Sequence, residues 1–462
     1  MKSFAALSLA CLLSCVGLYA QKGGNIYIRN LEDQAALKQN MVKSNRLLQA
    51  QDDSKTALFL SEPLSVPTIR GAQAAFTAVS LSWSAPHWDR QRSKVWLRMY
   101  NNSDEEEYMQ IKVDEHRESS VEKFAGQLQF FQKIYRYCQL RVVLEAGANS
   151  SMENIVIRFY DPGPTSYKAK QAAAVARGSC DCPLPEFLER DEWCSGGRCP
   201  TSTSPQQTEV THLIVHHSAG SNASNDWPAV VRSIWDFHVN TREWADIGYN
   251  WLIDSDGKIY QGRGDDIRGA HFCGANSNTM GVCLLGTFTT EMPSQESQDA
   301  LSKLLSWKAC DRDIDPLQTQ LHPGTGKTIY TITGHRDGCA TECPGTAFFP
   351  TLASLRTKVD QQLKACATTS VETMAAAQEK IHLFPNPLFG DQLSIDLSAQ
   401  AFRSQPVYIE LINSANGRRL KEWMKSGQDR MATLAIGELP AGLYLLYIRS
   451  GEKAFIRKIV KY

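Results

Sequence analysis

The chain has 462 residues, which is too long for one ordinary domain and predicts roughly two to four. Its hydrophobic content of 42% is enough to build buried cores. Because 49 basic residues balance 49 acidic ones, no overall field attracts nucleic acid or an anionic membrane surface. We therefore expect no nucleic-acid partner.

Residues 1–20 have the pattern of an export signal peptide. A basic residue precedes an apolar run from Phe4 to Tyr19, and Ala20 is a small residue suited to cleavage. The alternative is lipoprotein processing, because Leu12-Leu-Ser-Cys15 resembles a bacterial lipoprotein box. No later apolar run approaches the roughly 20 residues that a membrane-spanning helix needs. The mature protein is therefore expected to carry no transmembrane segment.

The cysteines indicate an oxidising compartment. Of the 13 cysteines, two lie in the signal peptide and Cys343 is a metal candidate, so ten remain, an even number that suits disulfides. The candidate pairs are Cys194 with Cys199, Cys273 with Cys283, and Cys310 with Cys339, while Cys180 and Cys182 have Cys138 and Cys366 as candidate partners. Sequence spacing leaves this connectivity open.

Residues 21–167 are predicted to form a mainly β domain of unknown role. The stretch from Ala35 to Ala50 has helical character, whereas later runs favour strands, namely Val95–Tyr100, Tyr108–Val113 and Asn154–Tyr160. Three tryptophans offer a carbohydrate-stacking surface as an alternative to core packing, which is the commoner fate of aromatic residues on strands: Trp83, Trp88 and Trp96.

A linker is predicted over residues 168–182, and a second domain over residues 183–366. In this domain strands alternate with helices, which predicts an α/β domain with a mixed sheet flanked by helices. The predicted strands are Leu213–His217, a hairpin around Asp256-Gly257, and Gly281–Gly286. The predicted helices follow a cap at Asp226 or span Ser294–Cys310 and Phe348–Leu363.

Metal-ligand residues occur at the end of one strand and in a later loop. His216 and His217 are adjacent on a strand, where side chains point to opposite faces, so only one of them can bind a given metal. His335 and Cys343 lie eight positions apart in a segment rich in glycine and proline. A set of three ligands favours catalytic zinc, because structural zinc usually has four protein ligands.

Two other interpretations of these residues remain open. His335 is a surface loop residue and Cys343 half of a cystine in the first interpretation. In the second, Cys343 and His335 are the nucleophile and base of a cysteine hydrolase.

The segment from Phe187 to about Lys364 resembles the peptidoglycan recognition protein domain, which is also the domain of type 2 N-acetylmuramoyl-L-alanine amidases. The resemblance extends over many motifs in order: Leu188-Glu-Arg-Asp-Glu-Trp193, Leu213-Ile-Val-His-His-Ser, Phe237-His-Val-Asn-Thr-Arg242, Trp244-Ala-Asp-Ile-Gly-Tyr-Asn-Trp, Asp256-Gly-Lys-Ile-Tyr-Gln-Gly-Arg-Gly264, Gly269-Ala-His271, Gly281-Val-Cys-Leu-Leu-Gly-Thr-Phe, Gly334-His-Arg-Asp and Ala340-Thr-Glu-Cys-Pro-Gly.

This resemblance implies a zinc site, a catalytic pair and a substrate groove. The implied Zn²⁺ ligands are His216, His335 and Cys343, with His217 a bystander. Tyr249 and Thr341 match catalytic positions. The implied groove for muramyl sugar and stem peptide is lined by His238, Arg242, His271 and Asn276. In the blander alternatives, His238 caps a helix, Arg242 is a solvated charge and Asn276 shapes a turn.

The resemblance also implies hydrolysis of the amide bond between N-acetylmuramic acid and L-alanine in peptidoglycan. Family members that only bind peptidoglycan typically lack the cysteine ligand, which this chain retains as Cys343. A non-catalytic peptidoglycan-binding surface protein is the alternative. A structural or adhesive surface protein is a further one, since the amidase-like segment covers less than half of the chain.

Residues 367–382 are predicted as an alanine-rich linker, and residues 383–462 as a small β-sandwich. This last domain resembles the C-terminal sorting domain of the type IX secretion system of Bacteroidota, through Pro385-Asn-Pro387, Gly442-Leu-Tyr444 and a lysine-rich end. The resemblance implies the secretion machinery as a partner and a secreted or outer-surface location reached through the periplasm. The alternative is an accessory sugar-binding sandwich.

Overall fold

The computed structural model forms two compact units, residues 1–362 and residues 363–462. The residues that it describes are 25–30, 35–44, 47–66, 68–69, 72–73, 78–101, 108–114, 123–131, 133, 135–163, 165, 182–376, 381–397, 405–414, 419–426, 428–450 and 453–462. The predicted signal peptide, and the predicted linker up to residue 181, lie outside these ranges.

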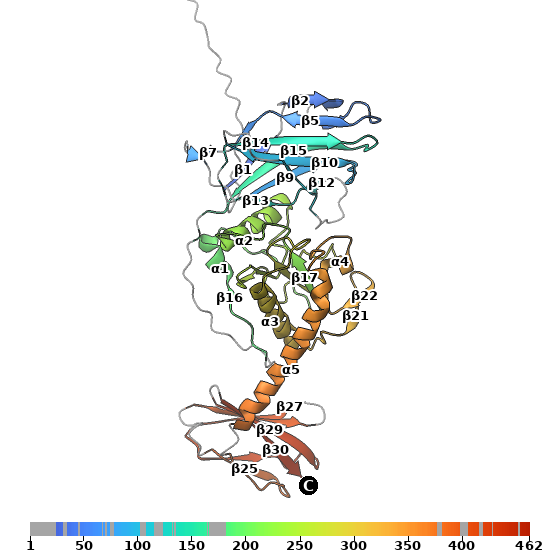
Figure 1. Ribbon diagram of the computed structural model, residues 1–462. Coiled ribbons are helices and arrows are strands. Elements are labelled where there is room, and N and C mark those ends of the chain that lie inside the picture. The colour runs from blue at the N-terminus through green and yellow to red at the C-terminus, as the bar shows by residue number, and fades with distance from the viewer. Residues whose placement is uncertain are drawn as a thin grey trace, which may run out of the picture. The chain divides into compact units, whose positions relative to one another are not determined.

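The N-terminal part of the first unit contains two large antiparallel sheets (Figure 1) and a separate two-stranded sheet of β7 and β8. One has the strand order β12-β9-β15-β4-β3 and the other β11-β10-β14-β5-β2. The strands are β1 (Asn25–Asn30), β2 (Ala35–Gln39), β3 (Met41–Ser44), β4 (Leu47–Ala50), β5 (Ala57–Ser61), β6 (Leu64–Ser65), β7 (Thr68–Ile69), β8 (Ala72–Gln73), β9 (Ala78–Ser84), β10 (Ser93–Tyr100), β11 (Met109–Gln110), β12 (Lys123–Ala125), β13 (Gln129–Phe130), β14 (Tyr137–Leu144) and β15 (Ser151–Asp161). The expectation of a mainly β domain therefore agrees with the described strands.

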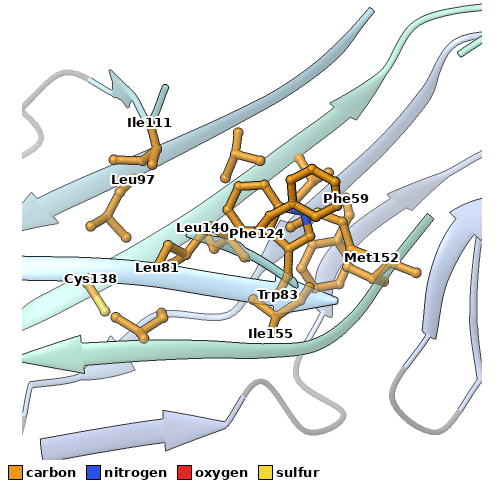
Figure 2. Packing of buried hydrophobic residues seen from close by; sticks show 14 of the residues in the cluster. Phe59, Leu81, Trp83, Leu97, Ile111, Phe124, Cys138, Leu140, Met152 and Ile155 are labelled. Carbon is orange, nitrogen blue, oxygen red and sulfur yellow. The ribbon is translucent and has the colours of Figure 1, made fainter. Parts of the chain in front are cut away.

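One hydrophobic core joins the two sheets, because alternate residues of β9 and β15 and of β10 and β14 point into it. Figure 2 shows Phe59, Trp83 and Phe124 packed together in this core. The rings of Trp83 and Trp88 lie 5.1 Å apart, and both side chains are buried. The sugar-stacking alternative is therefore wrong for these two tryptophans, which fill the core.

The helix predicted between Ala35 and Ala50 is wrong, because this segment forms β2, β3 and β4. Asn40 adopts a positive φ of 50° between β2 and β3, and its side-chain amide donates to the carbonyl groups of Asp52 and Lys55. Strand β2 pairs with β5, and β4 pairs with β15. Sheet pairing and burial of Leu48 thus override the local helical propensity.

The central domain is built on a six-stranded mixed sheet of order β16-β19-β18-β20-β17-β23. Only the β18–β19 pair is antiparallel among these neighbours. The elements are β16 (Phe187–Leu188), α1 (Arg190–Trp193), η1 (Ser195–Gly197), β17 (His212–His217), α2 (Trp227–Asp236), η2 (Phe237–Thr241), β18 (Trp251–Ile253), β19 (Ile259–Gln261), β20 (Thr279–Leu284), α3 (Gln295–Asp311), β21 (Thr319–His322), β22 (Lys327–Tyr330), β23 (Ile332–Gly334), α4 (His335–Gly338), η3 (Phe349–Thr351) and α5 (Leu352–Ala376). The predicted α/β domain with a mixed sheet is confirmed.

Helices cover both faces of this sheet. Leu252 of β18 packs in the cluster that contains α2, whereas the neighbouring Trp251 meets Trp307 of α3 on the other face. Asp226 caps α2 by accepting a hydrogen bond from the amide of Ala229 at 2.9 Å. Helix α5 continues through Ala376 into the segment predicted as a linker, which its high alanine content favours.

The second unit contains two further sheets around one core. Their orders are β24-β25-β28 and β27-β26-β29-β30. The strands are β24 (Leu383–Phe384), β25 (Gln392–Asp396), β26 (Val407–Asn413), β27 (Arg419–Lys425), β28 (Met431–Ala435), β29 (Gly442–Ser450) and β30 (Lys453–Lys461). Ile395 and Leu434 of one sheet share a cluster with Ile409 and Leu446 of the other, as expected for a small sandwich. No helix in the described ranges combines the length and apolar character needed to cross a bilayer.

The disulfides differ in part from the predicted pairs. Cys194 and Cys199 are bonded as predicted, but Cys273 pairs with Cys339 rather than with Cys283. Cys283 is a buried thiol on the central strand β20, and Cys138 is a buried thiol in the N-terminal core. Three more cysteines are disulfide-bonded, namely Cys182, Cys310 and Cys366. Sequence spacing could not reveal that the loop of Cys273 lies against α4, which precedes Cys339.

Asp236, the last residue of α2, provides a test of the packing around this helix. Burial raises the pKa of its carboxyl group from 3.8 to about 7, against the opposing charges of Arg198 and Arg232. Because the pKa is raised in the folded state, the protonated carboxyl group stabilises the fold below pH 4. This stabilisation is lost as the pH rises to 7, and the loss in the free energy of unfolding is about 4 kcal/mol at most. We therefore predict that Asp236→Asn melts near the wild-type temperature at pH 4 but above it at pH 8. If calorimetry shows the same difference in melting temperature between variant and wild type at both pH values, the prediction is wrong.

Candidate metal centre and substrate groove

The pairing of two parallel strands brings two histidines to one edge of the sheet. Val215 of β17 lies opposite Gly334 of β23, and the next residue in each segment is a histidine, His216 or His335. Their ring centroids are 4.6 Å apart. The loop after α4 returns to this edge and places the Cys343 Sγ atom 3.7 Å from His216 Nδ1. The three predicted ligands therefore meet in space.

The donor set fits zinc. The ligand atoms of His216, His335 and Cys343 all lie within 4.8 Å of one another, and the three residues are at most 1% exposed. Zinc–nitrogen and zinc–sulfur bonds of ordinary length in a tetrahedron place the two ligand atoms about 3.5 Å apart, close to the 3.7 Å between Cys343 and His216. The amide of His217 donates a hydrogen bond to Cys343 Sγ at 3.3 Å, which favours the thiolate form.

His217 points away from this donor group, as strand alternation predicts. Its Nδ1 atom accepts a hydrogen bond from the amide of Phe288 at 3.3 Å, and its ring packs near that of Phe288. The backbone of His217 supports the cysteine ligand while its side chain belongs to the opposite face of the strand.

His271 and Asn276 form a support behind His216. His271 Nδ1 and His216 Nε2 are hydrogen-bonded at 3.0 Å, which holds the ligand ring in one orientation. The side-chain oxygen of Asn276 accepts from the amides of His271 and Phe272, so the turn-shaping alternative for Asn276 describes its observed bonds. A Cβ atom at Gly281 would lie 2.6 Å from the His271 ring, which explains the glycine there. Substrate contact by His271 or Asn276 stays a prediction.

Tyr249 and Thr341 lie beside the donor group. The Tyr249 ring is 5.4 Å from that of His216, measured between centroids, and its side chain is buried. Burial, followed by the Cys283 and Cys343 thiols, raises the pKa of Tyr249 well above its ordinary value. The phenol therefore keeps its proton at neutral pH and can donate a hydrogen bond. The Thr341 hydroxyl accepts from the amide of Cys343 at 3.0 Å and so shapes the ligand loop.

The other predicted groove residues surround one tryptophan. The ring of His238, in η2, stacks on Trp244 at 4.6 Å, and the Arg242 guanidinium lies 5.2 Å from the same ring. His238 Nδ1 accepts from the amide of Gly248, ahead of β18, rather than capping its own helix. Trp244 and Asn276 line a cavity of about 550 Å³, a volume typical of ligand sites. The solvated-charge alternative for Arg242 is wrong, because its side chain is only 11% exposed.

Two other clusters of potential ligands are already occupied by the protein itself. Cys273 and Cys339 lie near His335 but are joined to each other in a disulfide. The carboxylates of Asp265, Asp266 and Asp311 surround the Lys308 ammonium group at 2.6, 2.9 and 2.8 Å. Neither cluster therefore competes with the His216 group as the metal centre.

Sequence reasoning missed three residues at this site. Trp244 was part of a matching motif, and its position after Arg242 is the one signal that pointed to the groove. Cys283 was taken as half of a cystine, whereas its thiol is hydrogen-bonded to Tyr249. Asp114 belongs to the N-terminal sandwich and forms an ion pair with Arg242, with Nε and Oδ2 3.5 Å apart. No local sequence pattern could have placed Cys283 or Asp114 at this site.

Two segments of the chain match known families. Residues 206–346 match the family of N-acetylmuramoyl-L-alanine amidases, and residues 382–462 match the secretion system C-terminal sorting domain. Peptidoglycan-recognition protein LB of Drosophila melanogaster is 33% identical over 209 residues, which are 43% of this chain and 84% of that protein. An N-acetylmuramoyl-L-alanine amidase of Sus scrofa is 34% identical over 162 residues, which are 34% of this chain and 25% of that protein.

A solved structure is similar over the same segment. Wild-type Drosophila PGRP-LB shares 32% identity and covers 36% of this chain and 92% of its own, with a TM-score of 0.31. The sequence relationship, the mixed sheet and the His/His/Cys group coincide in one domain. The chain therefore belongs to the peptidoglycan-recognition protein family, with an N-acetylmuramoyl-L-alanine amidase domain at its centre and a secretion sorting domain at its C-terminus.

Proposed function

We propose that this protein is a secreted, zinc-dependent N-acetylmuramoyl-L-alanine amidase that cleaves the amide bond between N-acetylmuramic acid and L-alanine in peptidoglycan. The observation that carries the proposal is Cys343, whose sulfur lies within the same donor group as His216 and His335. Family members that only bind peptidoglycan typically lack this ligand. A chain that holds all three donors in one buried cluster is suited to hydrolysis.

Zinc held by His216, His335 and Cys343 would supply a polarised carbonyl and a water of lowered pKa. Tyr249, whose ring lies 5.4 Å from that of His216, donates its phenolic hydrogen to the oxygen on which negative charge develops. His271 keeps the His216 ring oriented through their hydrogen bond. The hydroxyl of Thr341 fixes the loop that carries the thiolate.

The groove residues are suited to a muramyl peptide. The Arg242 guanidinium is placed to pair with a carboxylate of the stem peptide, and the indole of Trp244 offers an apolar face beside it. His238, held between Trp244 and the amide of Gly248, is positioned to donate to the ligand's polar groups.

The cysteine ligand gives the most direct mutational test. We predict that Cys343→Ser abolishes hydrolysis and weakens zinc retention, because the site loses its only thiolate donor. The assay is the release of new amino termini from purified peptidoglycan, with zinc measured by mass spectrometry. Cys138→Ala removes a buried thiol from the N-terminal core and should keep its zinc. A fully active Cys343→Ser protein would exclude the proposed centre.

Tyr249 is predicted to act on turnover rather than on metal binding. Tyr249→Phe removes one hydrogen-bond donor to the developing oxyanion and should lower kcat by about 100-fold. Zinc content should stay at the wild-type level, because Tyr249 is not in the donor group. Steady-state kinetics on a soluble muramyl peptide, with zinc measured in the same preparation, separates the two effects. Unchanged kcat, or loss of zinc, would show that the assigned role is wrong.

The C-terminal sandwich is proposed to direct export through the type IX system after the signal peptide has delivered the chain to the periplasm. The match of residues 382–462 to a sorting-domain family supports this role. An enzyme exported in this way no longer faces the wall of its own cell, so the wall of another cell is its proposed substrate.

Deletion of residues 383–462 tests that role. We predict that the shortened protein accumulates in the periplasm in an active form, because the sorting signal is lost while the amidase domain is intact. Immunoblots of periplasmic and culture fractions, with the full chain as control, provide the measurement. Secretion at the level of the full chain would instead favour an accessory sugar-binding sandwich.

A further inference from the structure

The N-terminal sandwich and the amidase domain share a buried interface. Tyr160 and Leu128 of the sandwich belong to the same hydrophobic cluster as Trp193, Trp227 and Phe237 of the amidase domain. This contact lies on the outer face of the sandwich, separate from its own core. The first 362 residues form one compact unit, in keeping with such an interface.

Arg232 of α2 fastens the end of the sandwich to the amidase domain. Its guanidinium donates to the carbonyl groups of Pro162 at 2.9 Å and Gly163 at 3.0 Å, and to the Thr165 hydroxyl at 2.8 Å. The residue is only 3% exposed. A buried guanidinium with this many hydrogen bonds fixes the position of the segment that follows β15.

Asp114, near the end of the described segment that follows β11, reaches the groove. Its carboxylate oxygen Oδ2 lies 3.5 Å from Arg242 Nε, and the two side chains are 9% and 11% exposed. Water screens a pair at this depth less than it screens a surface pair, so removing one partner leaves the other charge buried and uncompensated.

Two outer ion pairs flank this contact. Lys112 pairs with Glu342, the neighbour of Cys343, and Lys123 pairs with Glu243, the neighbour of Arg242, at 3.8 and 3.4 Å. These pairs are largely exposed and contribute little energy each. Each of them joins the sandwich to a residue next to a proposed functional one, which places these sandwich residues beside the site.

In this arrangement the donor group and Tyr249 are buried. Cys343 and Tyr249 are 1% and 2% exposed, and His216 and His335 are fully buried. A muramyl peptide needs both the metal face and Arg242. We propose that the N-terminal sandwich is an intramolecular inhibitor of the amidase site, in which the Asp114 carboxylate occupies Arg242 in place of an anionic group of the substrate. This inference rests on the proposed function for the identity of the ligand.

The opposite role for Asp114 is participation in the reaction, for example as the proton acceptor that the donor group lacks. The two roles predict opposite changes in activity when the Asp114 carboxylate is removed. Removal of an inhibitory carboxylate raises activity and affinity, because a larger fraction of molecules can bind. Removal of a catalytic carboxylate lowers turnover and leaves affinity unchanged.

The experiment uses the full mature chain with zinc and compares Asp114→Ala and Asp114→Asn with wild type. If the open state is about 10% populated, kcat/KM for a soluble muramyl tripeptide rises about tenfold in both variants. Leu128→Glu, which places a charge in the shared cluster, should raise it as well. Glu62→Gln, which alters an exposed carboxylate on the same sandwich, should leave it unchanged.

Binding measured in a Cys343→Ser background separates this proposal from the proposed function. Calorimetric titration with the same muramyl tripeptide should show about tenfold tighter binding when Asp114→Ala is added. That gain supports the inhibitor even if no variant hydrolyses the ligand. Unchanged or weaker binding, or a lower kcat/KM in both Asp114 variants whose melting curves match the wild type, would overturn it.

Discussion

The parallel pairing of β17 with β23 is the constraint on which the site depends. Val215 and Gly334 are opposite each other in that pair, so His216, within β17, and His335, the first residue of α4, lie side by side. The carboxyl edges of parallel strands are where open α/β sheets commonly build their sites. A shift of register by one residue would move one imidazole to the other face of the sheet and remove the donor group.

The surroundings of this pair show how the fold keeps it usable. His271 holds the His216 ring, the amide of His217 donates to the Cys343 sulfur, and the Asn276 side chain holds the loop of His271. Each of these buried polar groups has a hydrogen-bond partner, as a preorganised site requires. The same burial that strengthens these bonds also raises the pKa of Tyr249, so its phenol stays protonated.

Much of the site was predictable from sequence because its signals are local. Strand alternation correctly separated His216 from His217, and the cap at Asp226 and the turn at Gly257 were found in place. The errors came from long-range contacts. Sheet pairing turned the segment from Ala35 to Ala50 into strands, and the approach of distant loops paired Cys273 with Cys339. The contact between Asp114 and Arg242 joins two domains, so the sequence around either residue does not predict it.

The central claim is that a zinc ion held by His216, His335 and Cys343 is required for hydrolysis. The most direct measurement is zinc content together with activity, in purified protein before chelation, after chelation and after zinc is returned. Because Asp114 is paired with Arg242 of the proposed groove, activity is followed in the Asp114→Ala protein as well as in the wild type. The account predicts about one zinc per chain, loss of amide cleavage on chelation and its recovery with zinc. Correctly folded protein that cleaves peptidoglycan equally well without metal would contradict it.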